Sequence, residues 1–222
     1  MRILAVSDEE SPRFWEYYTP GKLDGFDLIL SSGDLKAEYL SFLVTMGRSP
    51  VFYVHGNHDG DYKENPPEGC DCIDDMLVTW KGLRILGLGG SRRYKNGAYQ
   101  YTEAQMRSRI RKLKRAIELA GGVDIVLSHA APLGVGDADD LTHKGFAAFL
   151  EFIDFYHPQY LVHGHVHLNY GIKIPREREY SGTKVVNCCG YVILECEPGR
   201  KELPKRSFLQ RLLVRNYVNM DV

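Results

Sequence analysis

Short apolar runs recur along the chain, and polar side chains follow directly after each of them. Such runs, bounded by turn residues, are typical of strands that are buried on both faces. We therefore predict buried strands at residues 3–6, 27–30, 51–54 and 124–127, and a fifth that starts at Tyr160 and leads into the histidine-rich segment 163–167.

Helical periodicity occurs between these runs. Thr102 and Gln105 match a capping box, and apolar residues then recur every three or four positions until Gly121 and Gly122 end the helix near Ala120. Further helices are predicted at residues 37–46 and 145–156, and a short one is predicted from Ser11 as N-cap and Pro12 through Tyr18.

The other apolar stretches have the spacing of hairpins, residues 76–80 with 83–88 and residues 184–187 with 191–196, the second turning at 187–190. Residues 61–75 and 132–144 read as loops. The second loop is long enough to be functional. We attach no function to the tail from Lys205. At 222 residues we predict a single domain, 1–222, and alternation alone favours one sheet.

Composition narrows the class of protein. The formal net charge is −1, so no overall basic field attracts nucleic acid or anionic lipid, and no apolar run is long enough to span a membrane. The amino terminus reads as a core strand and not as an export signal. Five cysteines without paired spacing are typical of reduced thiols, so we expect a cytoplasmic protein.

Side chains that can bind metals follow all five strands. They are Asp8, Asp34, Asn57 with His58, His129, and His165 with His167. In open α/β sheets, sites form outside the carboxyl ends of the strands, so we expect these residues to converge. If the backbone stays extended, His165 and His167 point the same way about 6 to 7 Å apart, which suits one histidine for each of two cations. Gly164 between the histidines fits a tight turn, since glycine adopts positive φ freely.

Carboxylate and imidazole ligands without a thiolate indicate a dinuclear site of mixed oxygen and nitrogen ligands. A carboxylate such as Asp34 can bridge two cations. Two cations that share a hydroxide supply a nucleophile at neutral pH, and a spare protonated histidine assists the leaving group.

The blocks Gly33-Asp34, Gly56-Asn57-His58-Asp59, His129 and Gly164-His165-Val166-His167 resemble the motifs of the calcineurin-like metallophosphoesterases. The resemblance implies a four-layer αββα sandwich, an α+β or α/β fold in which two mixed β-sheets pack face to face with helices outside. It also implies roles: Asp8, Asp34 and His167 hold a first cation, Asp34, Asn57, His129 and His165 hold a second, and His58, beside Asn57, is the catalytic acid or transition-state contact.

One position departs from the pattern. The family's first motif is Asp-x-His, whereas this chain has Asp8-Glu9-Glu10. Either Glu10 replaces the imidazole as a ligand or the first site is weakened. With Glu10 bound, carboxylates predominate in the first site, so among two divalent ions chosen from Mn, Fe, Zn or Ni we favour Mn.

The resemblance implies a metal-dependent phosphodiesterase or phosphatase that acts on a small-molecule phosphoester. Substrate contacts are expected from Arg92, Arg93, Asp137 and His143, although a solvated turn and ordinary loop structure are the simpler interpretations. The alternatives are a catalytically weak or inactive scaffold that binds a protein partner, and a nuclease. No aromatic residues are interleaved with the basic face of helix 102–120, which argues against nucleic acid. We expect no membrane partner, and the sequence defines no oligomeric state.

Overall fold

The computed structural model describes residues 1–167, 175–199 and 216–221. Its first sheet contains, in spatial order, β13 (Gly190–Glu195), β1 (Arg2–Ser7), β2 (Leu28–Ser31), β3 (Val51–Tyr53) and β4 (Asp71–Cys72). The second sheet contains β11 (Glu177–Tyr180), β12 (Thr183–Asn187), β10 (Tyr160–His163), β9 (Ile125–Ser128), β6 (Leu83–Leu88), β5 (Leu77–Trp80) and β14 (Tyr217–Asn219). A small third sheet pairs β7 (Ser91–Arg92) with β8 (Gln100–Tyr101). The helices are α1 (Ala37–Gly47), the 3-10 helix η1 (Asp59–Lys63), α2 (Glu103–Ala120) and α3 (Ala147–Tyr156).

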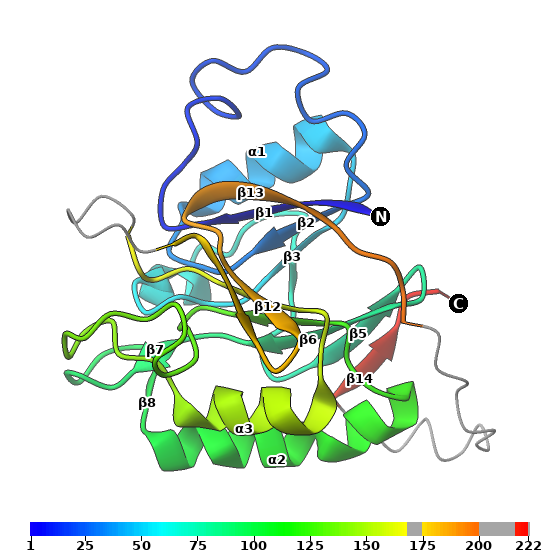
Figure 1. The fold of residues 1–222 in the computed structure, drawn as a ribbon. Coiled ribbons are helices and arrows are strands. Elements are labelled where there is room, and N and C mark those ends of the chain that lie inside the picture. Colours follow the sequence, from blue (N-terminus) through cyan, green and yellow to red (C-terminus); the bar gives the residue numbers. More distant parts are fainter. Residues whose placement is uncertain (168–174, 200–215, 222) are drawn as a thin grey trace.

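The two large sheets form the middle layers of a four-layer sandwich, with α1 on one side and α2 and α3 on the other (Figure 1). Strand β1 shows why its sequence is apolar without interruption. Ile3 and Ala5 pack into the core between the sheets, whereas Leu4 and Val6 pack into the core under α1. Successive side chains of a strand point to opposite faces, so a strand covered on both faces needs apolar residues at every position. The αββα architecture is confirmed, and the single sheet expected from alternation alone is wrong.

The long helix follows its sequence signals closely. Thr102 caps α2 through a capping box with Gln105, and Gly121 ends the helix in the left-handed conformation. The helices predicted at 37–46 and 145–156 are confirmed as α1 and α3, to within two residues. Among the described residues, no helix is long and apolar enough to cross a membrane.

The short helix predicted from Ser11 to Tyr18 is wrong, because this segment is a succession of turns. Phe14 packs edge-on against Tyr191 with ring centroids 5.0 Å apart, and the adjacent Trp15 packs against Phe42 at the same separation. Two neighbouring aromatic side chains are thus both held against the body of the protein, and this packing overrides the helix-start signal.

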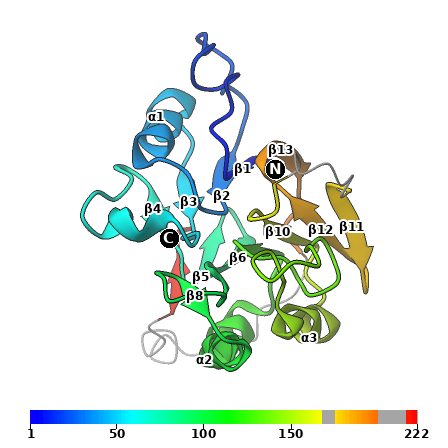
Figure 2. The ribbon, with the colours of Figure 1, turned by 90° about the vertical axis from the view of Figure 1, so that its left-hand side faces the viewer.

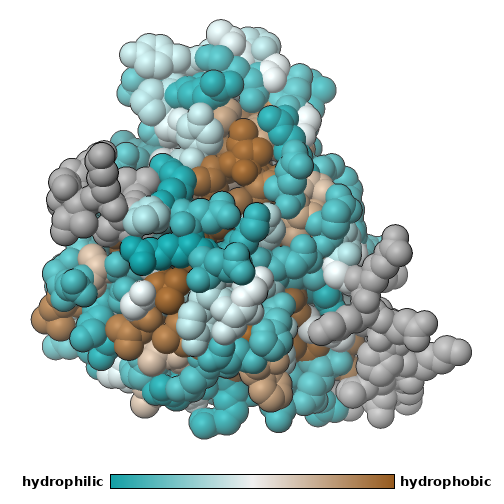
Figure 3. All heavy atoms as spheres, viewed as in Figure 1, coloured by the Kyte–Doolittle hydropathy of each residue, from teal (hydrophilic) through white to brown (hydrophobic). Residues whose placement is uncertain are grey.

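The predicted closing hairpin is also wrong. β12 pairs with β10 and β11 in the second sheet, whereas β13 pairs antiparallel with β1 in the first. The turn at 187–190 therefore carries the chain from one sheet to the other. In the loop predicted at 61–75, the structure has η1 and the edge strand β4. The face in Figure 3 is mainly hydrophilic, with apolar residues in separate patches, as expected when most apolar side chains lie in the cores.

Strands β1, β2 and β3 are mutually parallel, as are β6, β9, β10 and β12. Their carboxyl ends meet at one edge of the sandwich, onto which Figure 2 looks. A direct bond joins the two sheets there, because the backbone N–H of His165 after β10 donates to Asp8 after β1. The topology therefore brings together the polar residues that follow these strands.

Candidate metal centre

His129 lies at the centre of this edge and is completely buried. Its Nδ1 lies 2.8 Å from the Ser32 carbonyl oxygen, so Nδ1–H donates there and Nε2 faces the other way. Nε2 lies 3.2 Å from Asn57 Oδ1 and 3.3 Å from Asp34 Oδ2. A second hydrogen bond that fixes the ring and its tautomer is the usual arrangement of a metal-binding histidine.

Asp34 is held in place by the loop after β3. Its Oδ1 accepts the backbone N–H of His58 at 2.8 Å, and its own backbone N–H donates to Asp59 Oδ2 at 2.9 Å. Burial opposes ionisation of Asp34, but the charge and hydrogen bond of His129 hold the pKa of this carboxyl well below its usual range. The same charges act on His129: burial lowers its pKa, but Asp34 and Asp8 raise it to about 9. Asp34 and His129 each favour the charged form of the other. A metal cation can therefore take the place of the imidazole proton between them.

Asp59 supports this loop from beneath. It is 3% exposed, and its Oδ2 also accepts the backbone N–H of Gly56 at 2.7 Å. Burial and the negative charge of Asp34 raise the pKa of Asp59 to about 6. Asp59 therefore fixes the two segments that carry Asp34 and Asn57.

The segment after β10 is not extended, contrary to our expectation. The strand ends at His163, His165 has φ 66°, and the Val166 N–H donates to the Gly164 carbonyl oxygen. Gly164 is needed for a different reason from the one predicted: its φ is not positive, but a Cβ there would overlap Asp8 Oδ2 and the Ser7 hydroxyl. The tight turn places the ring of His165 with its centroid 4.8 Å from that of His129.

Asp8, Asp34 and His165 all adopt the left-handed conformation, with φ of 62°, 56° and 66°. This conformation is uncommon for residues other than glycine and clusters at functional sites. Burial raises the pKa of Asp8, whose carboxylate accepts the His165 N–H. Asp8, Asp34, Asn57, His129 and His165 thus converge as predicted, and their individual metal-binding roles stay predictions.

His167 and Glu10 are not part of the group of ligand atoms formed by Asp34, His129 and His165. His167 Nδ1 lies 3.4 Å from Glu9 Oε1, and Cys189 Sγ joins this pair in a group whose ligand atoms are all within 4.8 Å of one another. Glu10 points elsewhere: its Oε1 accepts the backbone N–H of Lys36, the N-cap of α1, at 3.3 Å. Sequence reasoning did not identify Glu9 or Cys189, because Cys189 becomes a neighbour only through the crossing between sheets.

Two of the predicted substrate contacts, Arg93 and Asp137, are held by hydrogen bonds within their own surroundings. Arg93 donates to the Gln100 carbonyl oxygen and to Gln105 Oε1, and Asp137 accepts two backbone N–H groups of its own loop, so both have structural partners. Arg92 is half-buried in β7. His143 lies beside His165, with ring centroids 5.1 Å apart. No pattern in the sequence pointed to Tyr94, whose hydroxyl lies 3.4 Å from Asn57 Nδ2.

A half-buried polar network supports the loop that carries Asn57 and His58. His55 Nδ1 lies 2.6 Å from Asp74 Oδ2, and Arg109 lies against the other oxygen of Asp74 at 3.5 Å. Burial lowers the pKa of His55, but the hydrogen bond and charge of Asp74 raise it to about 9. His55 therefore has a structural partner, as does His163, which is buried with Nδ1 2.9 Å from the Gly164 oxygen.

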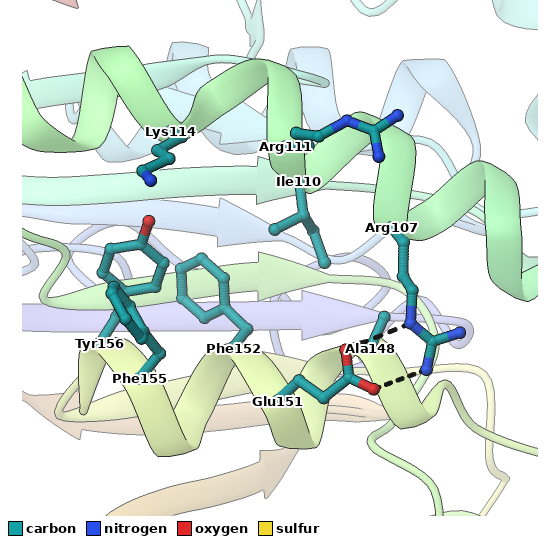
Figure 4. A pocket seen from close by; sticks show the side chains of 9 residues that line it. All are labelled: Arg107, Ile110, Arg111, Lys114, Ala148, Glu151, Phe152, Phe155 and Tyr156. Carbon is teal, nitrogen blue, oxygen red and sulfur yellow. Dashed lines mark hydrogen bonds and ion pairs between the residues drawn. The ribbon is translucent and has the colours of Figure 1, made fainter.

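The open groove between α2 and α3 lies elsewhere. Figure 4 shows Phe152, Phe155 and Tyr156 from α3 facing Ile110 and Lys114 of α2. It measures about 360 Å³, and none of the predicted site residues line it. The predicted metal-binding residues lie on the loops that follow the strands.

The residues at the strand ends fit a divalent cation. Asp34, His129 and His165 each offer one ligand atom, and these atoms all lie within 4.8 Å of one another. Imidazole suits zinc, iron, nickel and copper, and carboxylate suits magnesium and manganese, so this mixed set can take a first-row transition metal.

A cluster of carboxylate, amide and imidazole groups at the strand ends of an αββα sandwich is consistent with a metallophosphoesterase. The chain belongs to this family: the family model for calcineurin-like phosphoesterases matches residues 1–169. The family uses divalent metal ions for phosphoester hydrolysis.

One curated relative and two solved structures show distant similarity to the chain. The UPF0046 protein T07D4.2 of Caenorhabditis elegans is 26% identical over 149 residues, which cover 65% of this chain, and the chain spans only 35% of that relative's length. One solved structure aligns with 87% of this chain and 94% of its own at a TM-score of 0.62 and 16% identity. The crystal structure of TT1561 of Thermus thermophilus aligns with 85% of this chain and 88% of its own at a TM-score of 0.52 and 16% identity. At these identities the two structures show the fold alone.

Proposed function

We propose that the protein hydrolyses a small-molecule phosphoester at the strand-end cluster with the help of two divalent cations. The observation that carries the proposal is the meeting of three ligand atoms from three loops: His129 Nε2 lies within 3.3 Å of both Asn57 Oδ1 and Asp34 Oδ2. In this proposal Asp34 contacts both cations, and Asn57, His129 and His165 complete the shell of the second.

Bound divalent cations would supply a nucleophile from water at neutral pH and would neutralise charge on the phosphoryl group. The chain's own residues position the reaction. His58 is exposed at the rim of the cluster, and its backbone N–H holds Asp34 Oδ1. Its imidazole therefore lies outside the buried cluster and can donate a proton to the leaving oxygen. Tyr94, beside Asn57, lies where it can contact a bound phosphoester.

The proposal is tested with purified protein by elemental analysis and by hydrolysis of nitrophenyl phosphate and bis(nitrophenyl) phosphate with Mn, Fe, Zn or Ni. We expect two cations per chain, hydrolysis of at least one ester, and loss of both in the Asp34→Ala variant. Metal binding without hydrolysis of any ester would favour the scaffold hypothesis, and cleavage of nucleic acid alone would favour the nuclease. Absence of bound metal would refute the proposal.

We propose that the protein acts in the cytoplasm. All five cysteines are reduced thiols, the adjacent Cys188 and Cys189 among them. Reduced thiols persist where glutathione and thioredoxin are present. A thiol beside a metal centre would also be exposed to oxidation in a secreted protein.

A further inference from the structure

The group formed by Glu9, His167 and Cys189 combines three ligand types at the solvent side of the strand ends. We infer that it is a cation site with a thiolate ligand, in which Glu9 and Cys189, and not Glu10, complete the shell around His167. This inference rests on the proposed function in one respect, that His167 binds metal.

The spacing fits a shared ion. His167 Nδ1 and Glu9 Oε1 lie 3.4 Å apart. Two ligands at roughly 2.05 Å from a tetrahedral ion are about 3.3 Å from each other, so the observed pair already has the separation of two ligands. A thiolate needs a slightly longer bond of about 2.3 Å, and the Cys189 sulfur lies within 4.8 Å of one ligand atom each of Glu9 and His167.

The backbone around Cys189 is built to hold this position. The Asn187 side chain accepts the Cys189 N–H at 2.9 Å and donates to the Val166 oxygen at 2.7 Å, which joins the cysteine to the turn that carries His167. Arg176 Nη1 donates to the Cys189 oxygen at 3.0 Å. Cys189 also forms a β-bridge with Ser7, two residues before Glu9. All three ligands are therefore fixed relative to one another by main-chain contacts.

An ion can reach the group from solvent. A cavity of about 250 Å³ is lined by Glu9, Glu10, Arg176 and Cys189 among others, and Glu9 is exposed. Cys189 itself is 4% exposed, so its sulfur is shielded from bulk water while it faces the other ligands. A partly desolvated thiol next to an imidazole and a carboxylate is a suitable setting for a transition metal, whose binding would release the thiol proton.

Glu10 does not have this geometry. Its carboxylate accepts the backbone N–H of Lys36 at the N-terminus of α1 and lies 3.8 Å from Lys36 Nζ. The chain therefore offers matched controls: Glu10 for Glu9, and Cys188 for Cys189. Cys188 is completely buried, its sulfur lies 3.3 Å from the hydroxyl oxygens of both Ser7 and Ser32, and burial raises its pKa to about 11.

The test uses the full chain loaded with Co²⁺, because a thiolate bound to cobalt adds an intense charge-transfer absorption in the near ultraviolet. We expect this band in the wild type and in Cys188→Ser, and its loss in Cys189→Ser. Elemental analysis should show one cation fewer per chain in Cys189→Ser under limiting metal. Glu9→Gln should weaken binding of one cation at least tenfold, the scale expected for a perturbed metal shell, and Glu10→Gln should not.

Alkylation provides a measurement on unaltered protein. Cobalt should slow modification of Cys189 by iodoacetamide and leave the rate at the half-buried Cys70 unchanged, as followed by mass spectrometry. A cobalt-loaded wild type without the band, a band that persists in Cys189→Ser, or equal effects of Glu9→Gln and Glu10→Gln would overturn the inference. In those cases two bound cations and hydrolysis would still support the proposed function, whereas a chain that binds no metal would refute both.

Discussion

Replacement of Gly56 by Ala tests how tightly the loops of the centre are packed. A Cβ at this position would overlap Asp34 Oδ1 and would lie 2.7 Å from the backbone nitrogen of Asp34. Rotation of the Asp34 side chain cannot relieve the second contact, so the two loops must separate. Gly60, four residues further on, is the matched control, because a Cβ there meets only Ala98 at an ordinary 3.6 Å.

The size of the effect follows from what the separation breaks. Overpacking costs about 1 to 3 kcal/mol, and loss of the bond from the His58 N–H to the charged Asp34 costs about 1.5 to 3 kcal/mol. We expect a loss of stability of about 3 kcal/mol or more in Gly56→Ala. In a chain of this length that corresponds to a fall in Tm of roughly 6 to 12 °C.

The assay is thermal unfolding of metal-free Gly56→Ala and Gly60→Ala, followed by elemental analysis after exposure to Mn²⁺. Gly60→Ala should unfold within about 2 °C of the wild type, since surface substitutions usually change stability by less than about 0.5 kcal/mol. Gly56→Ala should also retain less than the full complement of cations, because Asp34 is displaced. Equal Tm values and equal metal content in the two variants would show that the close approach of these loops contributes neither to stability nor to metal binding.

Three further predictions concern the same centre. Asp34→Ala should remove both cations, as measured by elemental analysis, and full retention of one would contradict its bridging role. His58→Ala should keep the metal but lower the rate by about 10² to 10⁴ for poor leaving groups and by less for nitrophenolate; an equal loss for both would indicate charge stabilisation instead of proton donation. Metal-free protein should lose stability as the pH rises, because the folded pKa of about 9 at His129 lies above its usual 6.5. This contribution, on the order of 3 kcal/mol, is fully present below about pH 6.5 and lost as the pH rises through 9. Added metal should reduce this decline in denaturant unfolding, since the ion replaces the proton at His129, whereas the part that comes from His55, whose folded pKa is also about 9, should remain. An identical pH dependence with and without metal would be inconsistent with binding at His129.

The residues that sequence could place are those whose position is set by the ends of strands. Asp8 and His129 follow a buried strand directly and Asp34 follows one within three residues, and parallel strands deliver such residues to one edge whatever the details of the loops. The helix from Glu103 was equally predictable, because its cap and its end are local signals.

What sequence could not place depends on contacts between distant segments. Cys189 enters the centre because β12 and β13 belong to different sheets, and a pattern typical of a hairpin does not report which sheet each strand joins. Glu10 and Glu9 are adjacent and chemically alike, so only the packing of α1 determines which of them reaches His167. The need for glycine at 164 likewise arises from Asp8, far away in the chain.

The pairing of β1 with β13 has a consequence for synthesis of the chain. Arg2 pairs with Glu195, so one edge of β1 has no partner until β13 has been translated. At roughly 5 to 20 residues per second, the apolar segment from Ile3 to Val6 waits on the order of 10 to 40 s with an open hydrogen-bonding edge. Ribosome-bound chains that stop before Gly190 should therefore recruit chaperones and resist protease poorly. Chains released after Glu195 can close the first sheet.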